Sequence, residues 1–231
     1  MSSENRMSVR RSLIPLVLAL FAARCTNGPH PTAVEQPAAP TPHFLRWAGG
    51  SAPQFSAVGA LAGLPGGALR ASLSAGLQLD RYTASFWAVR GEPRSLQINY
   101  LSATGDTTSA FLRLTTTDPA YVPGLGDLAP GDSVLITVTI DPDNIKVSLE
   151  PTGLVFGEPG QLQISYGGAD GDLNGDGVVD ETDAYIESRL LGLWYREGTN
   201  DVWEPIPAVQ ELAGKSFVSA LPHFCEYAIS W

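Results

Sequence analysis

The sequence predicts a mainly β protein, an antiparallel β-sandwich that carries a short calcium-loop–helix insertion. Strand-forming Val, Ile, Thr, Tyr and Trp are concentrated after residue 80. Short apolar runs follow one another there at close spacing, separated by Gly, Pro, Asn and Asp, and this arrangement is typical of antiparallel sandwiches. One stretch, residues 168–191, breaks the pattern because its oxygen-bearing side chains have the spacing of a calcium-binding loop.

The composition indicates a globular, loop-rich chain and narrows the range of partners. Hydrophobic residues make up 44% of the 231 residues, and 24 Gly and 18 Pro supply the turns between strands. The formal net charge of −10 argues against nucleic acid or an anionic membrane surface as the partner. We therefore expect the partner to be a protein or a glycan.

The N-terminus has the pattern of a bacterial-type export signal. Several arginines precede an apolar run over residues 13–23, which is too short to span a bilayer, so residues 1–24 are predicted to be the signal. Cys25 follows where a lipoprotein would be cleaved and lipidated, although Arg24 stands where such sites have a small residue. Ordinary cleavage near residue 25 is the alternative. We expect an exported, membrane-anchored lipoprotein, or otherwise a secreted or periplasmic protein.

A proline-rich tether is predicted over residues 25–42, because this stretch contains five prolines and almost no large apolar side chain. The β-sandwich domain is then residues 43–231, with the calcium-binding insert at 168–192. Cys25 and Cys225 are the two cysteines of the sequence. If Cys25 is lipidated or removed, Cys225 has no partner for an intrachain disulfide.

Individual strands are predicted where apolar residues alternate. Alternate apolar residues at 96–100 and at 134–140 would give two strands a buried face. Residues 82–89 are large on both faces and are expected to form a central strand. The Pro- and Gly-rich residues 119–132 are expected to form a loop. Further strands are expected at residues 44–47, 55–58, 111–114, 146–150, 154–156, 162–166, 193–196, 202–206, 216–221 and 226–231.

Residues 172–183 have the ligand pattern of an EF-hand calcium loop. Oxygen-bearing side chains occupy loop positions 1, 3, 5, 9 and 12, and a carbonyl oxygen would serve at position 7: Asp172, Asn174, Asp176, Asp180, Asp183 and the carbonyl of Val178. A hard divalent cation needs about six to eight oxygens, which a short loop supplies by curling around the ion. Gly177 at position 6 would allow the sharp turn.

Ca²⁺ is therefore the predicted ligand, and Mg²⁺ is disfavoured because it gives up its water reluctantly. A solvated acidic turn is the alternative. Val179 at position 8 is expected to point into the core. Acidic residues would open a helix after the loop, whose apolar stripe of Ile186, Leu190 and Leu191 would dock on the sandwich, and Gly192 would end it.

Two resemblances accompany these patterns. The run VSLEPTGLVFGEPGQLQISY, residues 147–166, resembles the strand–turn–strand core of the sandwich domain shared by ankyrins and netrin receptors and common in bacterial surface proteins. The ending from Trp203 to Ala228 is similar to the tail of bacterial relatives, with Cys225 in place of their serine. This resemblance covers roughly residues 133–231 and implies a sandwich without catalytic residues. The calcium segment resembles one repeat of a dockerin, which implies docking onto a cohesin.

The sequence predicts a non-catalytic module, because no convergent acid, base and nucleophile can be named. His223 and Cys225 are expected to be a hydrogen-bonded core histidine and a packed thiol, and a Cys–His nucleophile pair is the alternative. The tryptophans are expected to pack in the core or at strand ends, and a sugar-stacking platform is the alternative: Trp47, Trp87, Trp194, Trp203 and Trp231. The predicted function is a calcium-stabilised surface module for binding or scaffolding. A carbohydrate-binding module and dockerin-like docking are the alternatives, with membrane contact only through a lipid on Cys25.

Overall fold

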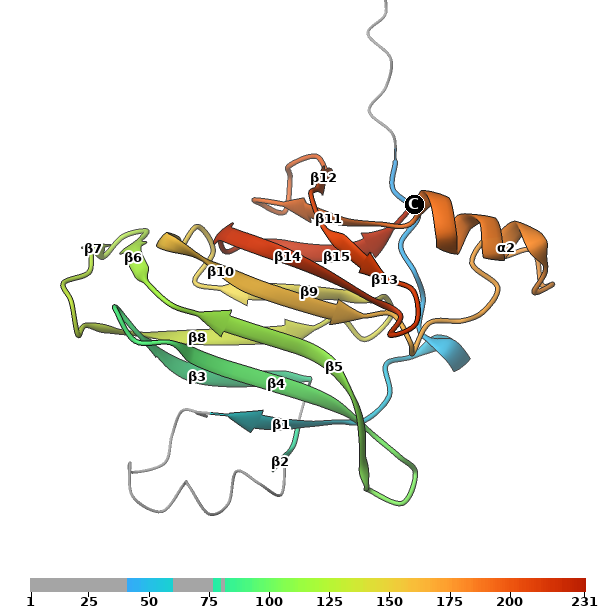
Figure 1. Cartoon of the computed structure of the whole chain (residues 1–231), viewed down its shortest axis with the longest axis horizontal. Coiled ribbons are helices and arrows are strands. Elements are labelled where there is room, and N and C mark those ends of the chain that lie inside the picture. Colours follow the sequence, from blue (N-terminus) through green and yellow to red (C-terminus); the bar gives the residue numbers. More distant parts are fainter. Residues whose placement is uncertain (1–40, 60–76, 80–81) are drawn as a thin grey trace, which may run out of the picture. The chain divides into compact units, whose positions relative to one another are not determined.

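The computed structural model describes residues 41–59, 77–79 and 82–231. The predicted export signal and nearly all of the predicted tether lie outside the described residues. The fold class is confirmed, because two antiparallel sheets pack as a sandwich with one short helical insert (Figure 1). No helix in the described part of the chain is both long and apolar enough to cross a membrane.

The first sheet contains nine strands within the described ranges, in the order β13-β14-β10-β5-β4-β1-β2, with β6 and β7 attached beside β10. Its neighbouring strands run antiparallel throughout. The strands are β1 (Phe55–Gly59), β2 (Leu77–Gln78), β4 (Arg94–Leu101), β5 (Thr107–Thr116), β6 (Pro119–Val122), β7 (Gly126–Asp127), β10 (Val155–Ser165), β13 (Val209–Glu211) and β14 (Ser216–His223).

The second sheet contains six strands in the order β12-β11-β15-β9-β8-β3, again antiparallel throughout. Its strands are β3 (Thr83–Val89), β8 (Ser133–Ile140), β9 (Lys146–Glu150), β11 (Gly192–Arg196), β12 (Glu204–Ile206) and β15 (Glu226–Ser230). Because β14 and β15 lie in different sheets, as do β9 and β10, the chain crosses repeatedly between the two layers.

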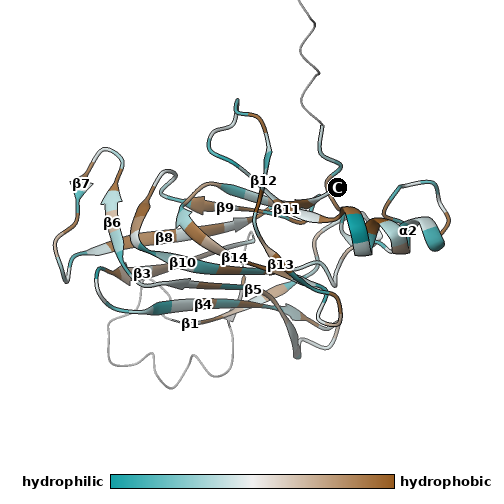
Figure 2. Ribbon diagram, turned by 45° about the horizontal axis from the view of Figure 1, so that its top comes forward, coloured by the Kyte–Doolittle hydropathy of each residue, from teal (hydrophilic) through white to brown (hydrophobic). Residues whose placement is uncertain are grey.

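The core forms where the two sheets face each other. The alternation predicted for β8 and β4 is confirmed, since every second residue of 134–140 is buried, as are the apolar residues at 96, 98 and 100. Figure 2 shows hydrophobic residues concentrated in strands such as β8. Within the core an aromatic cluster surrounds Phe111, whose ring centroid lies 5.0 Å from that of Phe55, 5.3 Å from that of Trp47 and 5.6 Å from that of Tyr100.

The prediction that residues 82–89 form a central strand is wrong. β3 lies at the edge of the six-stranded sheet. Trp87 is 47% exposed and pairs across the outer face with Leu135, which is 41% exposed. β3 is therefore apolar on both faces because Trp87 takes part in a cross-strand pair on the outer surface. Only the inner face of β3, which carries Phe86, is buried.

Two other local predictions need correction. Residues 119–132 contain β6 and β7, a small hairpin in which Tyr121 pairs with Val155 of β10. The strands expected at 154–156 and 162–166 belong to the single long strand β10, whose register shifts between Val155 and Gly160. A Cβ on Gly160 would lie 2.7 Å from the carbonyl oxygen of Thr115, so this irregularity brings two backbones unusually close.

Candidate calcium site

The insert leads from one sheet to the other. β10 ends at Ser165 in the nine-stranded sheet, and β11 begins at Gly192 in the six-stranded sheet. Between them lie the loop, the α-helix α2 (Glu181–Tyr185) and the π-helical turn η2 (Ile186–Leu190). Figure 1 shows α2 at the end of the sandwich where the C-terminus also lies.

The first half of the loop is folded around the Asp172 carboxylate. Its Oδ1 accepts hydrogen bonds from the N–H groups of Gly175 at 2.8 Å and Asp176 at 3.1 Å. Its Oδ2 accepts a hydrogen bond from the N–H of Gly177 at 2.7 Å. Gly177 has φ of +89°, so the glycine predicted at position 6 does supply the left-handed turn.

The ligand side chains at positions 3 and 5 also fold back onto the loop. The amide oxygen of Asn174 accepts a hydrogen bond from the N–H of Asp176 at 2.9 Å. The Asp176 carboxylate in turn accepts from the N–H of Val178 at 2.9 Å and from the Asn174 side-chain amide at 2.9 Å. The residues at positions 1, 3 and 5 are thereby brought together on one tight turn.

Asp183 at position 12 closes the loop. Its side chain is only 4% exposed. Its carboxylate accepts hydrogen bonds from the N–H groups of Asp180 at 2.9 Å, Leu173 at 2.7 Å and Asn174 at 3.3 Å. The Asp180 N–H, together with those of Leu173 and Asn174, holds the pKa of the Asp183 carboxyl below its usual range against the opposing effect of burial. Asp183 is therefore a fixed anion where the loop meets the helix.

Asp180 at position 9 has a second role as the N-cap of α2. Its carboxylate accepts a hydrogen bond from the N–H of Thr182 at 2.7 Å, and Asp183 bonds back to the Asp180 N–H. This reciprocal pair is a capping box, which satisfies backbone N–H groups at the start of the helix. The same two residues that would bind a cation therefore also fix the helix to the loop.

The donor set fits Ca²⁺ by its chemistry, since it consists of carboxylate, amide and carbonyl oxygens. A cavity of about 590 Å³ beside the loop is lined in part by Asp172 and Asn174, which leaves a hydrated cation room to approach. Within the described residues, no three His, Cys, Asp or Glu side chains already converge as a metal site. Binding would therefore require some carboxylate oxygens to turn from backbone N–H groups toward the ion.

Two expectations for the insert are wrong. Val179 does not point into the core and is 68% exposed, because the loop projects from the sandwich and its side chain lies over Gly171. The helix continues into the wider η2 turn, in which the N–H of Leu191 bonds to the carbonyl of Ile186 at 3.0 Å. This changes the helical phase, so Ile186 and Leu191 are buried as expected but Leu190 is 44% exposed.

A contact that the sequence did not reveal holds the helix to the nine-stranded sheet. The side-chain amide of Gln210, in β13, donates to the carbonyl of Glu187 at 2.8 Å and to the hydroxyl of Tyr166 at 3.0 Å. Lys215 forms an ion pair with the Glu187 carboxylate at 3.3 Å. No pattern marks Gln210, because β13 is three residues long and the side chain bonds to Glu187 and Tyr166, which lie 23 and 44 residues away in the sequence.

The other candidate residues are Cys225, His223 and the five tryptophans. Cys225 is a packed thiol, as predicted, and burial raises its pKa to about 12. His223 is only half-buried, contrary to prediction, since it is the last residue of β14; its Nε2 faces the exposed Glu197 carboxylate at 3.9 Å. Of the five tryptophans, Trp47 is fully buried, Trp87 is exposed and the other three are half-buried.

Comparison of the chain with known proteins finds no matching protein family, no similar curated protein and no similar solved structure.

Proposed function

We propose that this chain is an exported, non-catalytic module in which calcium stabilises a β-sandwich used for binding or scaffolding at the cell surface. The observation that carries the proposal is the closure of the loop by Asp183. This buried carboxylate joins position 12 to positions 2 and 3 of the same loop and to the start of the helix. A cation bound within the loop would therefore act directly on the folding of the whole insert.

Electrostatics gives calcium a stabilising role. Residues 170–187 contain acidic side chains and no basic one, and four of the carboxylates belong to the predicted ligands. Like charges held this close repel one another, and a divalent cation removes the repulsion. Because the insert connects the two sheets and buries Ile186 and Leu191, its ordering would also fix the end of the sandwich.

The predicted affinity is modest. Asp183 has a shorter side chain than the glutamate that usually binds in a bidentate manner at position 12, and the described residues contain no second loop that would pre-organise the first. We expect a dissociation constant on the order of micromolar to millimolar, a range whose weaker end is that of extracellular calcium modules. Such a value suits an exported protein, which meets much more calcium than a cytosolic one.

Isothermal titration calorimetry of the chelator-treated full chain with Ca²⁺ tests the proposal. The wild type should bind one calcium ion, and the double variant Asp172→Ala/Asp176→Ala should show no binding. Asp127→Ala/Glu158→Ala is the matched control, because it removes two exposed carboxylates outside the insert and should bind as the wild type does. Equal binding by the two double variants would contradict the assignment of the site.

Docking of a partner protein onto the insert is a second candidate function. Four large apolar side chains are exposed on this segment: Val178, Val179, Tyr185 and Leu190. A cohesin domain is the appropriate probe, since the loop resembles a dockerin repeat. Calcium-dependent binding that is lost in Tyr185→Ser/Leu190→Ser would support docking, and no binding in either calcium or chelator would exclude this class of partner. The glycan alternative has less support, because Trp87 is the single exposed tryptophan among the described residues.

A further inference from the structure

The segment that follows the predicted tether is hydrogen-bonded to the six-stranded sheet. We call residues 43–47 the strap. The N–H of His43 donates to the carbonyl of Trp231 at 2.9 Å, and the N–H of Leu45 donates to that of Ile229 at 3.0 Å. On its other side the carbonyl of Leu45 accepts from the N–H of Ile145 at 2.8 Å. The strap therefore lies between the end of β15 and the turn before β9.

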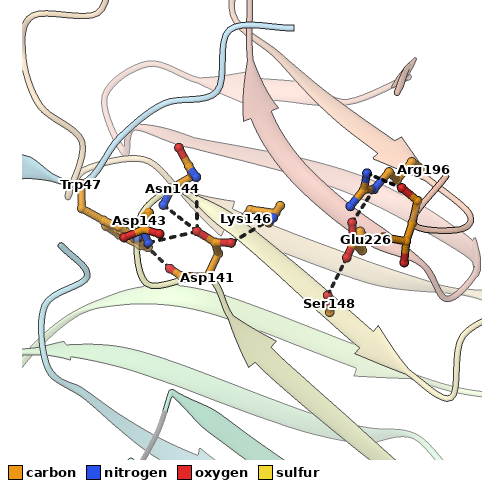
Figure 3. Close-up of polar contacts among 9 residues, drawn as sticks. Trp47, Asp141, Asp143, Asn144, Lys146, Ser148, Arg196 and Glu226 are labelled. Atoms are coloured by element: carbon orange, nitrogen blue, oxygen red, sulfur yellow. Dashed lines mark hydrogen bonds and ion pairs between the residues drawn. The ribbon is translucent and has the colours of Figure 1, made fainter. Parts of the chain in front are cut away.

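Trp47 fixes the end of the strap. Its side chain is fully buried, and its indole N–H donates to the carbonyl of Asp141 at 2.9 Å (Figure 3). The carboxylate of Asp141 accepts hydrogen bonds from the N–H groups of Asp143 and Asn144 and pairs with Lys146 at 2.9 Å. The strap is thus attached to a turn that is itself held in place by its own side chains.

The strap also contacts the beginning of the insert. The carbonyl of Arg46 accepts a hydrogen bond from the N–H of Asp170 at 3.1 Å. Directly after the strap, the N–H of Ala48 donates to the carbonyl of Gly168 at 2.9 Å. Gly168 is packed tightly, because a Cβ there would lie 3.0 Å from the Tyr100 ring and 3.3 Å from the Trp47 ring. Loop position 1 follows only two residues after the last of these contacts.

Trp231 connects the strap to the loop itself. Its indole N–H donates to the carbonyl of Leu173 at 3.2 Å, and its ring stacks on His43 with centroids 4.6 Å apart. Leu173 is loop position 2, between the predicted ligands Asp172 and Asn174, and its N–H donates to Asp183. The N–H of Leu173 is therefore bound to Asp183 at loop position 12, and its carbonyl is bound to the indole of Trp231.

We propose that Trp231 and the strap are positioning elements of the calcium loop, so that calcium binding and strap docking favour each other. The inference rests on the proposed calcium site. By thermodynamic linkage, the factor by which a docked strap raises calcium affinity equals the factor by which calcium favours the docked strap. Because the strap directly follows the predicted tether in sequence, calcium would control how firmly the tethered end is attached to the sandwich.

The first test is the calcium affinity of Trp231→Phe in the full chain. Phenylalanine retains an aromatic face for His43 but lacks the N–H that reaches Leu173. Loss of one such hydrogen bond predicts calcium binding weaker by about two- to tenfold. The matched control is Trp87→Phe, which alters an exposed ring on β3 and should leave the affinity unchanged.

The second test is hydrogen exchange in the strap, measured on the wild type so that it does not depend on any variant. Calcium should slow exchange of the Leu45 amide relative to chelator. The amides of Gly105 and Asp106, which donate to Ser102 within their own turn, should not respond. In Trp231→Phe the effect of calcium on the strap should shrink by the same factor as the affinity.

The possible failures are distinguishable. Calcium binding with unchanged strap exchange in the wild type and unchanged affinity in Trp231→Phe would overturn the coupling and leave the calcium site standing. No calcium binding by the wild type would overturn both proposals.

Discussion

Replacing Trp47 with alanine should destabilise the protein by about 3–5 kcal/mol, as is typical when a buried aromatic side chain is removed from a core. The side chain is fully buried, and its ring lies 5.7 Å from Phe55 and 5.3 Å from Phe111, measured between centroids. Alanine would leave a cavity between the strap and the aromatic cluster. The loss in free energy of unfolding therefore tests whether the strap is packed against the core of the folded domain.

Trp47→Phe separates the hydrogen bond from the packing. It removes the donor to the Asp141 carbonyl, 2.9 Å away, and retains much of the aromatic volume. Leaving a buried acceptor without its donor costs about 1–3 kcal/mol, which is an upper limit here because this hydrogen bond is only partly buried. We therefore expect Trp47→Phe to fall between the wild type and Trp47→Ala in free energy of unfolding.

Urea unfolding at equilibrium, with midpoint and slope fitted separately, provides the measurement. Trp87→Ala is the matched control, because the same substitution is made at a ring that is 47% exposed at a sheet edge. It should cost no more than about 1 kcal/mol, the value of a cross-strand pair. Equal losses for Trp47→Ala and Trp87→Ala would refute the burial of Trp47 and the docking of the strap.

Three further predictions concern the cysteines and the acid stability. The thiol of Cys225 should react with a thiol reagent only after unfolding, because the side chain is 1% exposed and burial raises its pKa to about 12; rapid reaction of the native protein would contradict this. Cys25→Ser should release the protein from membranes into the aqueous phase of a detergent partition, and unchanged partitioning would refute lipidation. Burial alone would raise the pKa of Asp141, but Lys146 and the N–H groups of Asn144 and Asp143 outweigh it and lower the pKa. The ionised Asp141 carboxylate should therefore stabilise the fold at pH values above 3.8, the ordinary pKa of the group, and this stabilisation should be lost as the pH falls below it. In Asp141→Asn, the urea unfolding midpoint should consequently fall less than in the wild type between about pH 6 and 2.

Several features that depend on local pattern were predicted correctly from the sequence. The buried faces of β4 and β8 follow from strict alternation, and the tight turn at Gly177 follows from the need for a left-handed residue at loop position 6. The same local rules place Asp172 and Asp183 on one closed loop. These features depend on residues close together in the sequence, and this is the physical reason why the sequence alone predicts them.

Features that depend on distant partners were not predicted. The edge position of β3 is decided by the order of strands in the sheet, to which the pattern of residues 83–89 is insensitive. Trp231 lies 58 residues from Leu173, and no spacing rule joins them. The exposure of Leu190 results from one π-helical turn, which a regular helical period does not anticipate.

The most direct test of the central claim is thermal unfolding of the wild type and of Asp172→Ala/Asp176→Ala, each in calcium and in chelator. At a calcium concentration about 100 times the dissociation constant, binding adds about 2.7 kcal/mol of stability. For a domain of this size, that corresponds to a rise in the wild-type midpoint of about 5–10 °C. The double variant should unfold at one temperature in both buffers, as a folded sandwich with a loosened insert. If the wild-type midpoint is also the same in calcium and in chelator, residues 172–183 are only an acidic turn and calcium has no part in the stability of this protein.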